Sequence, residues 1–261
     1  MQKPLILVTN DDGIHAPGIK ALIETLSSHA DLVVVAPHNE QSAVGLSITI
    51  RQPIKIHKRE AMFGVEAYAV IGTPADCVKM ALSVILKRKP NLIVSGINRG
   101  SNAGRNVLYS GTVSAVIEGS LREIPGIAFS CYDYIDPDYA PATTHIPSVV
   151  RYVLNHPLPE GTLLNVNFPS KKHGAYKGIK MARQGKQYWM EDPSHRSHPT
   201  EGESYWWLGA KMSAYLEHHE TDTQLLDQGW VTAVPVYVAE LTHHETLKER
   251  KSHFEDFFGA K

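Results

Sequence analysis

Cysteine is scarce in this sequence, with only Cys77 and Cys131 among 261 residues. The two thiols form neither a CxxC pair nor a zinc-type cluster, which excludes a disulfide framework and a cysteine-held metal. So few thiols are typical of a reducing compartment. The opening residues MQKPLILVTNDD hold a short apolar run that soon meets carboxylates, unlike a secretory leader. We therefore expect a cytoplasmic protein.

The sequence also lacks an excess of charge of either sign. Lys and Arg number 26 against 27 Asp and Glu, which gives a formal net charge of −1. No basic surplus is left to neutralise a long phosphodiester backbone, so extended nucleic acid is not an expected partner. No apolar run approaches the roughly 20 residues that cross a bilayer, so a membrane is not an expected partner either.

Short apolar runs and helical patterns alternate over the first two-thirds of the chain. Unbroken apolar runs of this length are typical of parallel strands buried on both faces, and between them apolar residues recur at helical spacing. Strands are predicted at residues 5–9, 32–36, 67–72, 91–96, 127–130 and 163–167, and helices at 17–26, 73–88, 110–121 and 148–155. This order predicts an α/β fold with a mostly parallel sheet and right-handed crossovers.

Two parts of the chain depart from this alternation. Residues 47–51 and 54–58 alternate apolar with polar side chains around Pro53, which predicts a half-exposed hairpin or an edge excursion that need not join the main sheet. From about residue 171 the pattern loosens and His and Trp become frequent. We therefore expect a catalytic core over residues 1–170 and an extension over 171–261, with a returning strand at 230–236 and a terminal helix. The aromatic residues of this extension predict contact with a second copy of the chain: Trp189, Trp206 and Trp207.

Oxygen-bearing side chains gather where three of the predicted buried strands end. They are Asn10-Asp11-Asp12 after the first strand, Asn39-Glu40-Gln41-Ser42 after the second, and Asn98 and Asn102 after the fourth. In an open parallel sheet, ligands bind outside the carboxyl ends of the strands. Oxygen donors without cysteine or a spaced histidine suit Mg²⁺ or Mn²⁺ better than zinc or copper.

The adjacent carboxylates of Asp11 and Asp12 would point to opposite faces if the strand continued through them. Gly13 allows the chain to turn, so that the two carboxylates can converge. Two converging anions call for a compensating cation. The alternative is a polar turn that only caps the following helix, and this motif alone does not separate the two interpretations.

A glycine-rich loop at residues 96–104 precedes the helix that begins around Ser110-Gly111-Thr112. Backbone N–H groups and the helix dipole attract anions at such a start, and phosphate is the natural occupant. No GxGxxG follows the first strand and no GxxxxGK[ST] is present, so neither a dinucleotide fingerprint nor a P-loop is predicted. Converging carboxylates together with an anion-binding helix start favour phosphoryl chemistry.

Five blocks of this sequence resemble, in order and spacing, the signatures of the SurE family, the stationary-phase survival proteins. They are VTNDDGIHAPGI at 8–19, Ala36-Pro37 leading to Gln41-Ser42, GTPADCV at 72–78, SGINRGSN at 95–102 and YSGTVSA at 109–115. The resemblance implies a Rossmann-like core and a homodimer or homotetramer built through carboxyl-terminal arms.

The same resemblance implies a metal-dependent phosphatase, a 5′/3′-nucleotidase that hydrolyses nucleoside 5′- and 3′-monophosphates and, in some members, short-chain polyphosphate. Carried over by position, the ligands of one divalent cation per subunit would be Asp11, Asp12, Ser42 and Asn98. The substrate phosphate would lie on Ser110, Gly111 and Thr112, with Asn102 beside them. Asp11 and Asp12 would be the catalytic pair.

The expected mechanism is attack on phosphorus by a metal-activated hydroxide. Asp11 or Asp12 could also take the proton. A phospho-aspartate route, with one of these carboxylates as nucleophile, is the alternative within enzymology. No basic group is assigned as the acid for the leaving alkoxide, although Arg99, Arg105 and His15 are close in sequence.

Two further interpretations do not require turnover. One is a nucleotide-binding regulatory module that uses the same loops, since an anion site on this fold does not establish catalysis. The other treats the core as a scaffold for the Trp- and His-rich extension. Paired histidines of that extension are interpreted as exposed side chains without a carboxylate partner: His195 and His198, His218 and His219, and His243 and His244. Cys77 lies on the inward pattern of its helix and is expected in the core.

Overall fold

The computed structural model describes residues 3–259. The strands are β1 (Leu5–Thr9), β2 (Asp31–Pro37), β3 (Lys55–Met62), β4 (Val65–Ile71), β5 (Leu92–Arg99), β6 (Gly126–Cys131), β7 (Thr162–Phe168), β8 (Ile179–Met181), β9 (Trp189–Met190), β10 (Ser194–Ser197), β11 (Ser204–Trp207), β12 (Lys211–Met212) and β13 (Val231–Tyr237). The α-helices are α1 (Pro17–Leu26), α2 (Pro74–Met80), α3 (Gly111–Ser120), α4 (Ala140–Asn155), α5 (Asp222–Asp227) and α6 (His244–Phe257).

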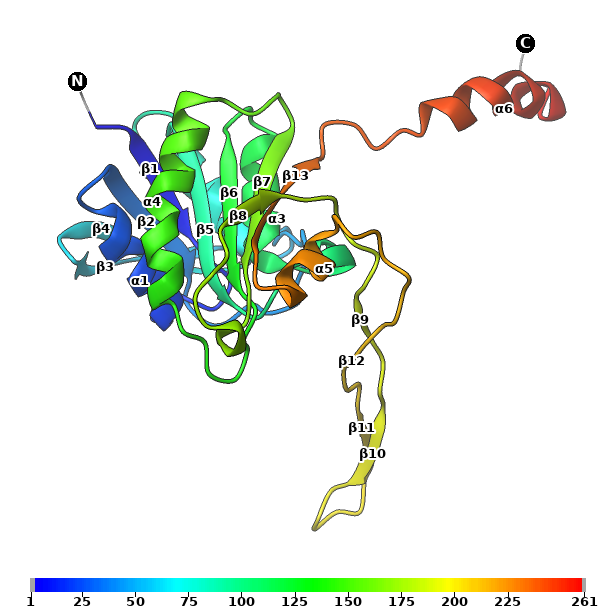
Figure 1. The fold of residues 1–261 in the computed structure, drawn as a ribbon, viewed down its shortest axis with the longest axis horizontal. Coiled ribbons are helices and arrows are strands. Elements are labelled where there is room, and N and C mark those ends of the chain that lie inside the picture. Colours follow the sequence, from blue (N-terminus) through cyan, green and yellow to red (C-terminus); the bar gives the residue numbers. More distant parts are fainter. Residues whose placement is uncertain (1–2, 260–261) are drawn as a thin grey trace.

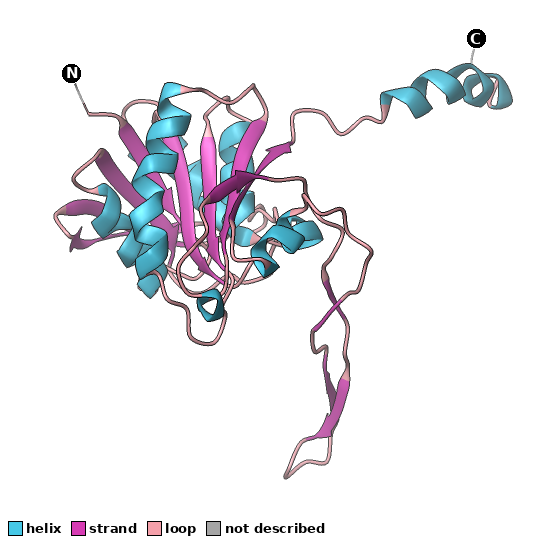
Figure 2. Ribbon diagram, in the orientation of Figure 1, coloured by secondary structure: helices cyan, strands magenta, loops and turns pink. Residues whose placement is uncertain are grey.

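Nine strands form one sheet in the order β3-β4-β2-β1-β5-β6-β7-β13-β8. The strands from β4 to β7 run parallel, while β3 pairs with β4 and β13 pairs with β7 in antiparallel fashion. Figure 1 shows this twisted sheet with helices on both faces, and Figure 2 shows its strands in one colour. The α/β fold with a mostly parallel sheet that the sequence predicts is confirmed.

The buried strands are apolar along their whole length because helices cover both sides of the sheet. All five residues of β1 are buried. On one face, the strands pack with α1 and α4 around the largest core cluster. On the other face, α2 and α3 cover two smaller clusters, and Cys77 is fully buried there, as expected for a core residue.

Local sequence signals set where the helices begin. Pro17 is the first residue of α1, where its missing N–H is not needed. Thr73 and Asp76 form a capping box at the start of α2, in which each side chain accepts a backbone N–H of the other. The Ser110 hydroxyl accepts the Val113 N–H at 3.1 Å and caps α3. These starts agree with the sequence prediction.

The predicted hairpin at residues 47–51 and 54–58 is wrong in part. Residues 47–51 form no strand, because Thr49 is held by α2 instead: its backbone N–H and its hydroxyl donate to the Asp76 carboxylate at 3.0 and 2.6 Å. The second half lies in β3, which pairs with β4 and forms an edge of the main sheet. The chain at residues 54–58 thus runs along the edge of the main sheet, and its antiparallel partner is β4 in place of residues 47–51.

Helix α4 also begins earlier than predicted, at Ala140 in place of residue 148. Pro147 lies inside this helix. The turns before it are retained because Ala142 and Ile146 are buried against the core cluster on that face. Tertiary packing thus outweighs the tendency of proline to end a helix.

The carboxyl-terminal third joins the sheet twice and leaves it after each of the two strands. β8 and β13 join its far edge, and the strand predicted at 230–236 corresponds to β13. Between them, residues 189–212 form a long antiparallel excursion that projects away from the α/β body, and α6 lies at the end of an extended segment (Figure 1). Within residues 3–259, no helix has both the length and the apolar character that crossing a membrane requires.

Candidate active site at the carboxyl ends of the central strands

The loops that follow β1, β2 and β5 meet at one edge of the sheet, because these strands are neighbours in the order β2-β1-β5. The Gln41 N–H donates to the Asp11 carbonyl at 2.7 Å, which joins the first two loops. The Arg99 N–H donates to Asp12 Oδ2 at 3.1 Å, which joins the first and third. The polar turns that the sequence places at separate strand ends therefore come together.

Asp11 is buried in this junction, with 4% of its surface exposed. Its Oδ1 accepts the hydroxyl of Thr112 from the first turn of α3. Burial raises the pKa of the Asp11 carboxyl to about 7, and the charge of Asp12 adds to the rise, while hydrogen bonds from Thr112 oppose it. A buried carboxylate beside a second one gains its largest stabilisation from a cation.

Asp12 lies nearer the surface and is half-buried. Burial raises the pKa of its carboxyl, while the hydrogen bond from the Arg99 N–H and the Arg99 charge lower it. The charge of Glu40 adds a further, smaller rise. Three carboxylates, those of Asp11, Asp12 and Glu40, thus follow one another from the interior to the surface, with Arg99 as the nearby cation.

In metal-free protein, the raised pKa of Asp11 predicts that stability falls as the pH rises from about 4 to about 7. Over that range the unfolded chain has lost the Asp11 proton while the folded protein keeps it, and the loss approaches tenfold in the folding equilibrium per pH unit. Urea unfolding in chelator at pH 5 and pH 8 measures it. Asp11→Asn should remove this part of the pH dependence. The same change in unfolding free energy between pH 5 and pH 8 in mutant and wild type would contradict the raised pKa of Asp11.

Asn98 and Ser42 flank the two aspartates but are held differently. Asn98 is buried at the end of β5. Its Nδ2 donates to the Gly100 carbonyl at 2.7 Å, so its side-chain oxygen points away from Gly100. Ser42 is exposed, and its hydroxyl donates to Glu40 Oε1 at 2.6 Å. Asn98 is therefore fixed in the junction, whereas Ser42 lies on its outer loop beside Glu40.

The start of α3 closes the junction from the side. Gly111 has no room for a side chain, because a Cβ there would lie 2.7 Å from the Cβ of Asp11. The Ser110 hydroxyl is used as the helix cap, and the Thr112 hydroxyl faces Asp11. Of the predicted phosphate-binding residues, Thr112 and Gly111 thus lie directly against the predicted metal ligand Asp11.

Asn102 is held by a buried polar network that the sequence analysis missed. Its Nδ2 donates to Ser130 Oγ at 2.8 Å, its N–H donates to Asn167 Oδ1 at 2.8 Å, and its carbonyl accepts Asn165 Nδ2 at 2.9 Å. Asn165 and Asn167 occupy alternate positions of strand β7, whose other residues after Thr162 are apolar. Two buried amides on one strand face are the signal that could have found this network.

A second anchor of the same loop comes from the far end of the chain. Asp222 is fully buried and accepts the N–H groups of Gly104 at 2.9 Å and of Gly185 and Thr223 at 2.8 Å each. Burial raises the pKa of its carboxyl and the three hydrogen bonds lower it. Asp222 therefore ties the glycine-rich loop to the root of the long excursion.

The three basic residues considered for the leaving group lie in different surroundings. Arg99 pairs with Glu40 at 3.3 Å and stacks over the Tyr134 ring at 4.6 Å, beside Asp12. Arg105 lies over the Tyr215 ring, and His15 is exposed. Of these three residues, Arg99 contacts the aspartate pair, through its backbone N–H on Asp12. Glu40, which pairs with Arg99, is one of the oxygen-bearing residues found in the sequence, but no role was predicted for it.

Comparison with known proteins shows the family of this chain. The family model described as "Survival protein SurE" matches residues 6–191. The chain belongs to the SurE family. It is 53% identical over 256 residues to a protein of Protochlamydia amoebophila named 5′-nucleotidase SurE, with 98% of each chain covered. It is 44% identical to a protein of the same name from Christiangramia forsetii, with 96% of this chain and 97% of that one covered.

A solved structure extends the SurE likeness to the fold. The SurE protein from Aquifex aeolicus superposes on this chain with a TM-score of 0.81 at 37% sequence identity, covering 96% of this chain and 100% of that one. The coverage includes the carboxyl-terminal third as well as the α/β body. The family expected from the five sequence blocks is therefore confirmed.

Proposed function

We propose that this chain is a metal-dependent phosphatase that hydrolyses nucleoside 5′- and 3′-monophosphates to nucleoside and phosphate, with short-chain polyphosphate as a further substrate. The observation that carries the proposal is the contact of Asp11, at the end of β1, with the first turn of α3, while the adjacent Asp12 accepts the Arg99 N–H from the loop after β5. Anionic side chains beside an anion-binding helix start are the two halves of a phosphoryl-transfer site. The relatives named 5′-nucleotidase support the substrate class.

The donor set at this junction fits a hard divalent cation, Mg²⁺ or Mn²⁺, one per subunit. Its donors are all oxygens, and the buried Asn10 Oδ1 beside them has no hydrogen-bond partner in the part of the chain that the structure describes. The proposed ligands are Asp11, Asp12, Ser42 and Asn98. When bound, such a cation neutralises phosphoryl oxygens and lowers the pKa of a bound water.

The residues of this chain would then divide the remaining tasks. Ser110, Gly111 and Thr112 present the amino end of α3 to the substrate phosphate, and the network around Asn102 keeps the facing loop in place. Thr112 also orients Asp11 through its hydroxyl. Arg99, fixed by Glu40, is the cation beside the aspartates that can bind a second phosphoryl oxygen.

Release of inorganic phosphate from AMP or GMP in the presence of Mn²⁺ tests the function. We expect turnover that chelator abolishes and added Mn²⁺ restores. The competing hypothesis, a nucleotide-binding module without turnover, predicts that AMP raises the melting temperature while no phosphate appears. Comparison of 3′-AMP with 5′-AMP and of short polyphosphate measures the finer specificity.

Thr112→Val is expected to lower kcat by roughly tenfold or more, because loss of a partner that orients a metal ligand typically costs 10–100-fold. The hydroxyl contacts Asp11, so the apparent affinity for Mn²⁺ should fall as well. Steady-state kinetics over a range of Mn²⁺ concentrations measures both. Thr144→Val on α4, whose hydroxyl donates to the Ala140 carbonyl, is the control. Wild-type kinetics in Thr112→Val would remove this residue from the site.

We also propose that the protein works as a homodimer or homotetramer. In α6 no residue is buried, and the side chains of Phe254, Phe257 and the adjoining Phe258 are exposed. The excursion at residues 189–212 exposes Trp206 and Trp207 in the same way. Apolar surfaces of this kind are covered by a partner subunit. Light scattering at micromolar concentration should find a dimer or tetramer; a monodisperse monomer would contradict the proposal.

A further inference from the structure

The tetrapeptide His-His-Glu-Thr occurs twice in the extension, at residues 218–221 and 243–246. Each copy runs into the start of a helix, the first into α5 and the second into α6. The two copies offer the same side chains for metal binding. Any difference between the two copies in metal binding must therefore come from the surrounding structure.

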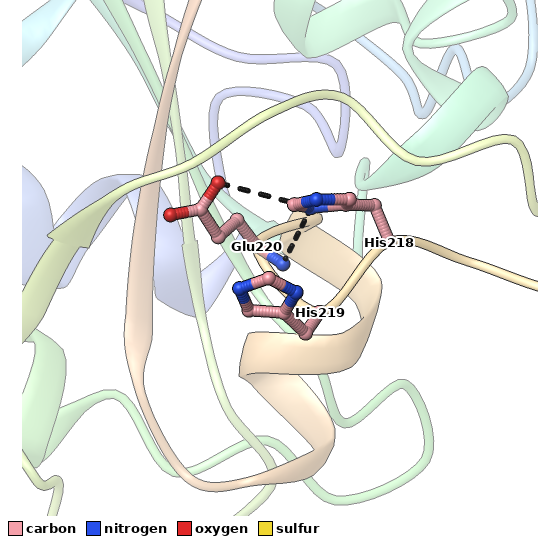
Figure 3. A group of neighbouring side chains, drawn as sticks. All are labelled: His218, His219 and Glu220. Atoms are coloured by element: carbon pink, nitrogen blue, oxygen red, sulfur yellow. Dashed lines mark hydrogen bonds and ion pairs between the residues drawn. The ribbon is translucent and has the colours of Figure 1, made fainter.

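In the first copy the side chains gather. One ligand atom from each of His218, His219 and Glu220 lies within 4.8 Å of the other two. His218 Nδ1 is 3.7 Å from Glu220 Oε2, and the two imidazole rings have centroids 4.2 Å apart. Figure 3 shows the three side chains together beside the start of α5. The expectation that these histidines have no carboxylate partner is therefore wrong, because Glu220 folds back onto His218.

In the second copy the same side chains disperse. His243 caps α6, where its Nδ1 accepts the Thr246 N–H at 3.2 Å and lies 2.7 Å from the Thr246 hydroxyl. His244 Nε2 lies 2.9 Å from Glu240, which precedes the tetrapeptide. Among residues 3–259, the group at 218–220 is the one cluster of three such ligand atoms. The second copy is thus a matched control within the same chain.

Backbone hydrogen bonds hold the turn that carries the first copy, within the turn itself and at its carboxyl-terminal end. The Thr221 N–H donates to the His218 carbonyl at 3.0 Å. Arg183, at the root of the excursion, donates its N–H to the Glu220 carbonyl at 3.0 Å and accepts the Asp222 N–H at 2.8 Å. Three ligands on a fixed turn lose less conformational entropy on binding a cation than three ligands on a mobile loop.

We propose that His218, His219 and Glu220 bind one borderline divalent cation of the Zn²⁺, Ni²⁺ or Cu²⁺ class, with water as the remaining ligand. Two imidazoles and one carboxylate favour these ions, whereas the oxygen donors around Asp11 favour Mg²⁺ or Mn²⁺. His218 Nδ1 accepts the Glu220 N–H at 3.2 Å, so it carries a lone pair on the side of the carboxylate. A cation bound to His218 Nδ1 would replace the hydrogen bond from the Glu220 N–H.

The position of the site indicates that a bound cation would hold the excursion against the glycine-rich loop. The neighbouring Glu217 accepts the N–H groups of Lys186 and Gln187 at 2.5 and 2.9 Å, and Asp222 holds Gly104. A cation on the turn between Glu217 and Asp222 would therefore stiffen the joint between the excursion and the glycine-rich loop. This second metal site is independent of the phosphatase activity, since its residues lie outside the aspartate junction.

The test is Zn²⁺ binding to the full chain in excess Mg²⁺, measured by equilibrium dialysis. We expect His219→Ala and Glu220→Gln each to lose one equivalent of Zn²⁺ per chain relative to wild type. The variant His243→Ala/His244→Ala should bind as wild type does. Every variant keeps Asp11 and Asp12, so Zn²⁺ bound there contributes equally to all of them.

Thermal unfolding supplies a second readout. Zn²⁺ should raise the melting temperature of wild type more than that of Glu220→Gln, a substitution that keeps the size of the side chain. Equal Zn²⁺ stoichiometry in wild type, His219→Ala and Glu220→Gln would overturn the proposal. Loss of the equivalent in the His243→Ala/His244→Ala control instead would also overturn it, by moving the site to the second tetrapeptide.

Discussion

Asp11→Asn and Asp12→Asn are each expected to lower kcat/KM for nucleoside monophosphates by about 10³-fold or more, which corresponds to about 4 kcal/mol of transition-state stabilisation. The substitution keeps the shape of the side chain and removes one charge. Because both carboxylates lie in the junction that we propose holds the divalent cation, either loss weakens the binding of that cation. Phosphate release from AMP with saturating Mn²⁺ measures the effect.

The matched control is Asp31→Asn, at the exposed start of β2, which should keep full activity. The fold should survive in all three variants, and without metal the junction variants should be no less stable than wild type, since they relieve carboxylate repulsion. Mn²⁺ should raise the melting temperature strongly in wild type and in Asp31→Asn, but not in Asp11→Asn or Asp12→Asn. A junction variant with near-normal, chelator-sensitive activity would show that these residues form a capping turn and that the metal binds elsewhere.

The second large effect is expected at Asp222. Asp222→Ala leaves three backbone N–H groups without their acceptor, and orphaned buried donors cost about 1–3 kcal/mol each before the structure relaxes. We expect a loss of about 3 kcal/mol in the free energy of unfolding. Because one of the three donors belongs to Gly104, KM for the nucleotide should also rise. Urea unfolding and steady-state kinetics measure the two effects.

Asp227→Ala, at the exposed end of the same short helix, is the control for Asp222→Ala and should change neither quantity. A stability within the range of that control would mean that water replaces the carboxylate as acceptor. Raised KM with unchanged stability would instead place the role of Asp222 in the loop alone. Only a lower free energy of unfolding together with a higher KM matches the three hydrogen bonds of Asp222.

The sequence predicts well those parts of the fold that depend on neighbouring residues, such as apolar runs and helix caps. β1 and β5 are unbroken apolar runs, and their burial on both faces follows from that composition. The starts of α1, α2 and α3 follow from Pro17, Thr73 and Ser110. Once the strands are parallel neighbours, the meeting of their carboxyl ends is a matter of topology, so the aspartate junction could be anticipated.

The parts that could not be predicted depend on pairs of residues far apart in the sequence. Thr49 leaves the expected strand because Asp76 accepts two of its donors. Asp222 reaches Gly104 across 118 positions, and Asn102 is fixed by residues of β6 and β7. No periodicity encodes such contacts. The interpretation of His218 failed for a related reason, since the direction of the Glu220 side chain depends on a turn that Arg183 holds.

α6 has a consequence for how the chain reaches its final form. The helix has 14 residues and buries none of them, and isolated helices of that length are marginal in water. Whatever completes its folding must come from a surface outside the α/β body, and a second copy of the chain is the surface we propose. The folded fraction of α6 then depends on protein concentration, because dilution separates the subunits. Dilution should therefore unfold α6 while the sheet stays folded.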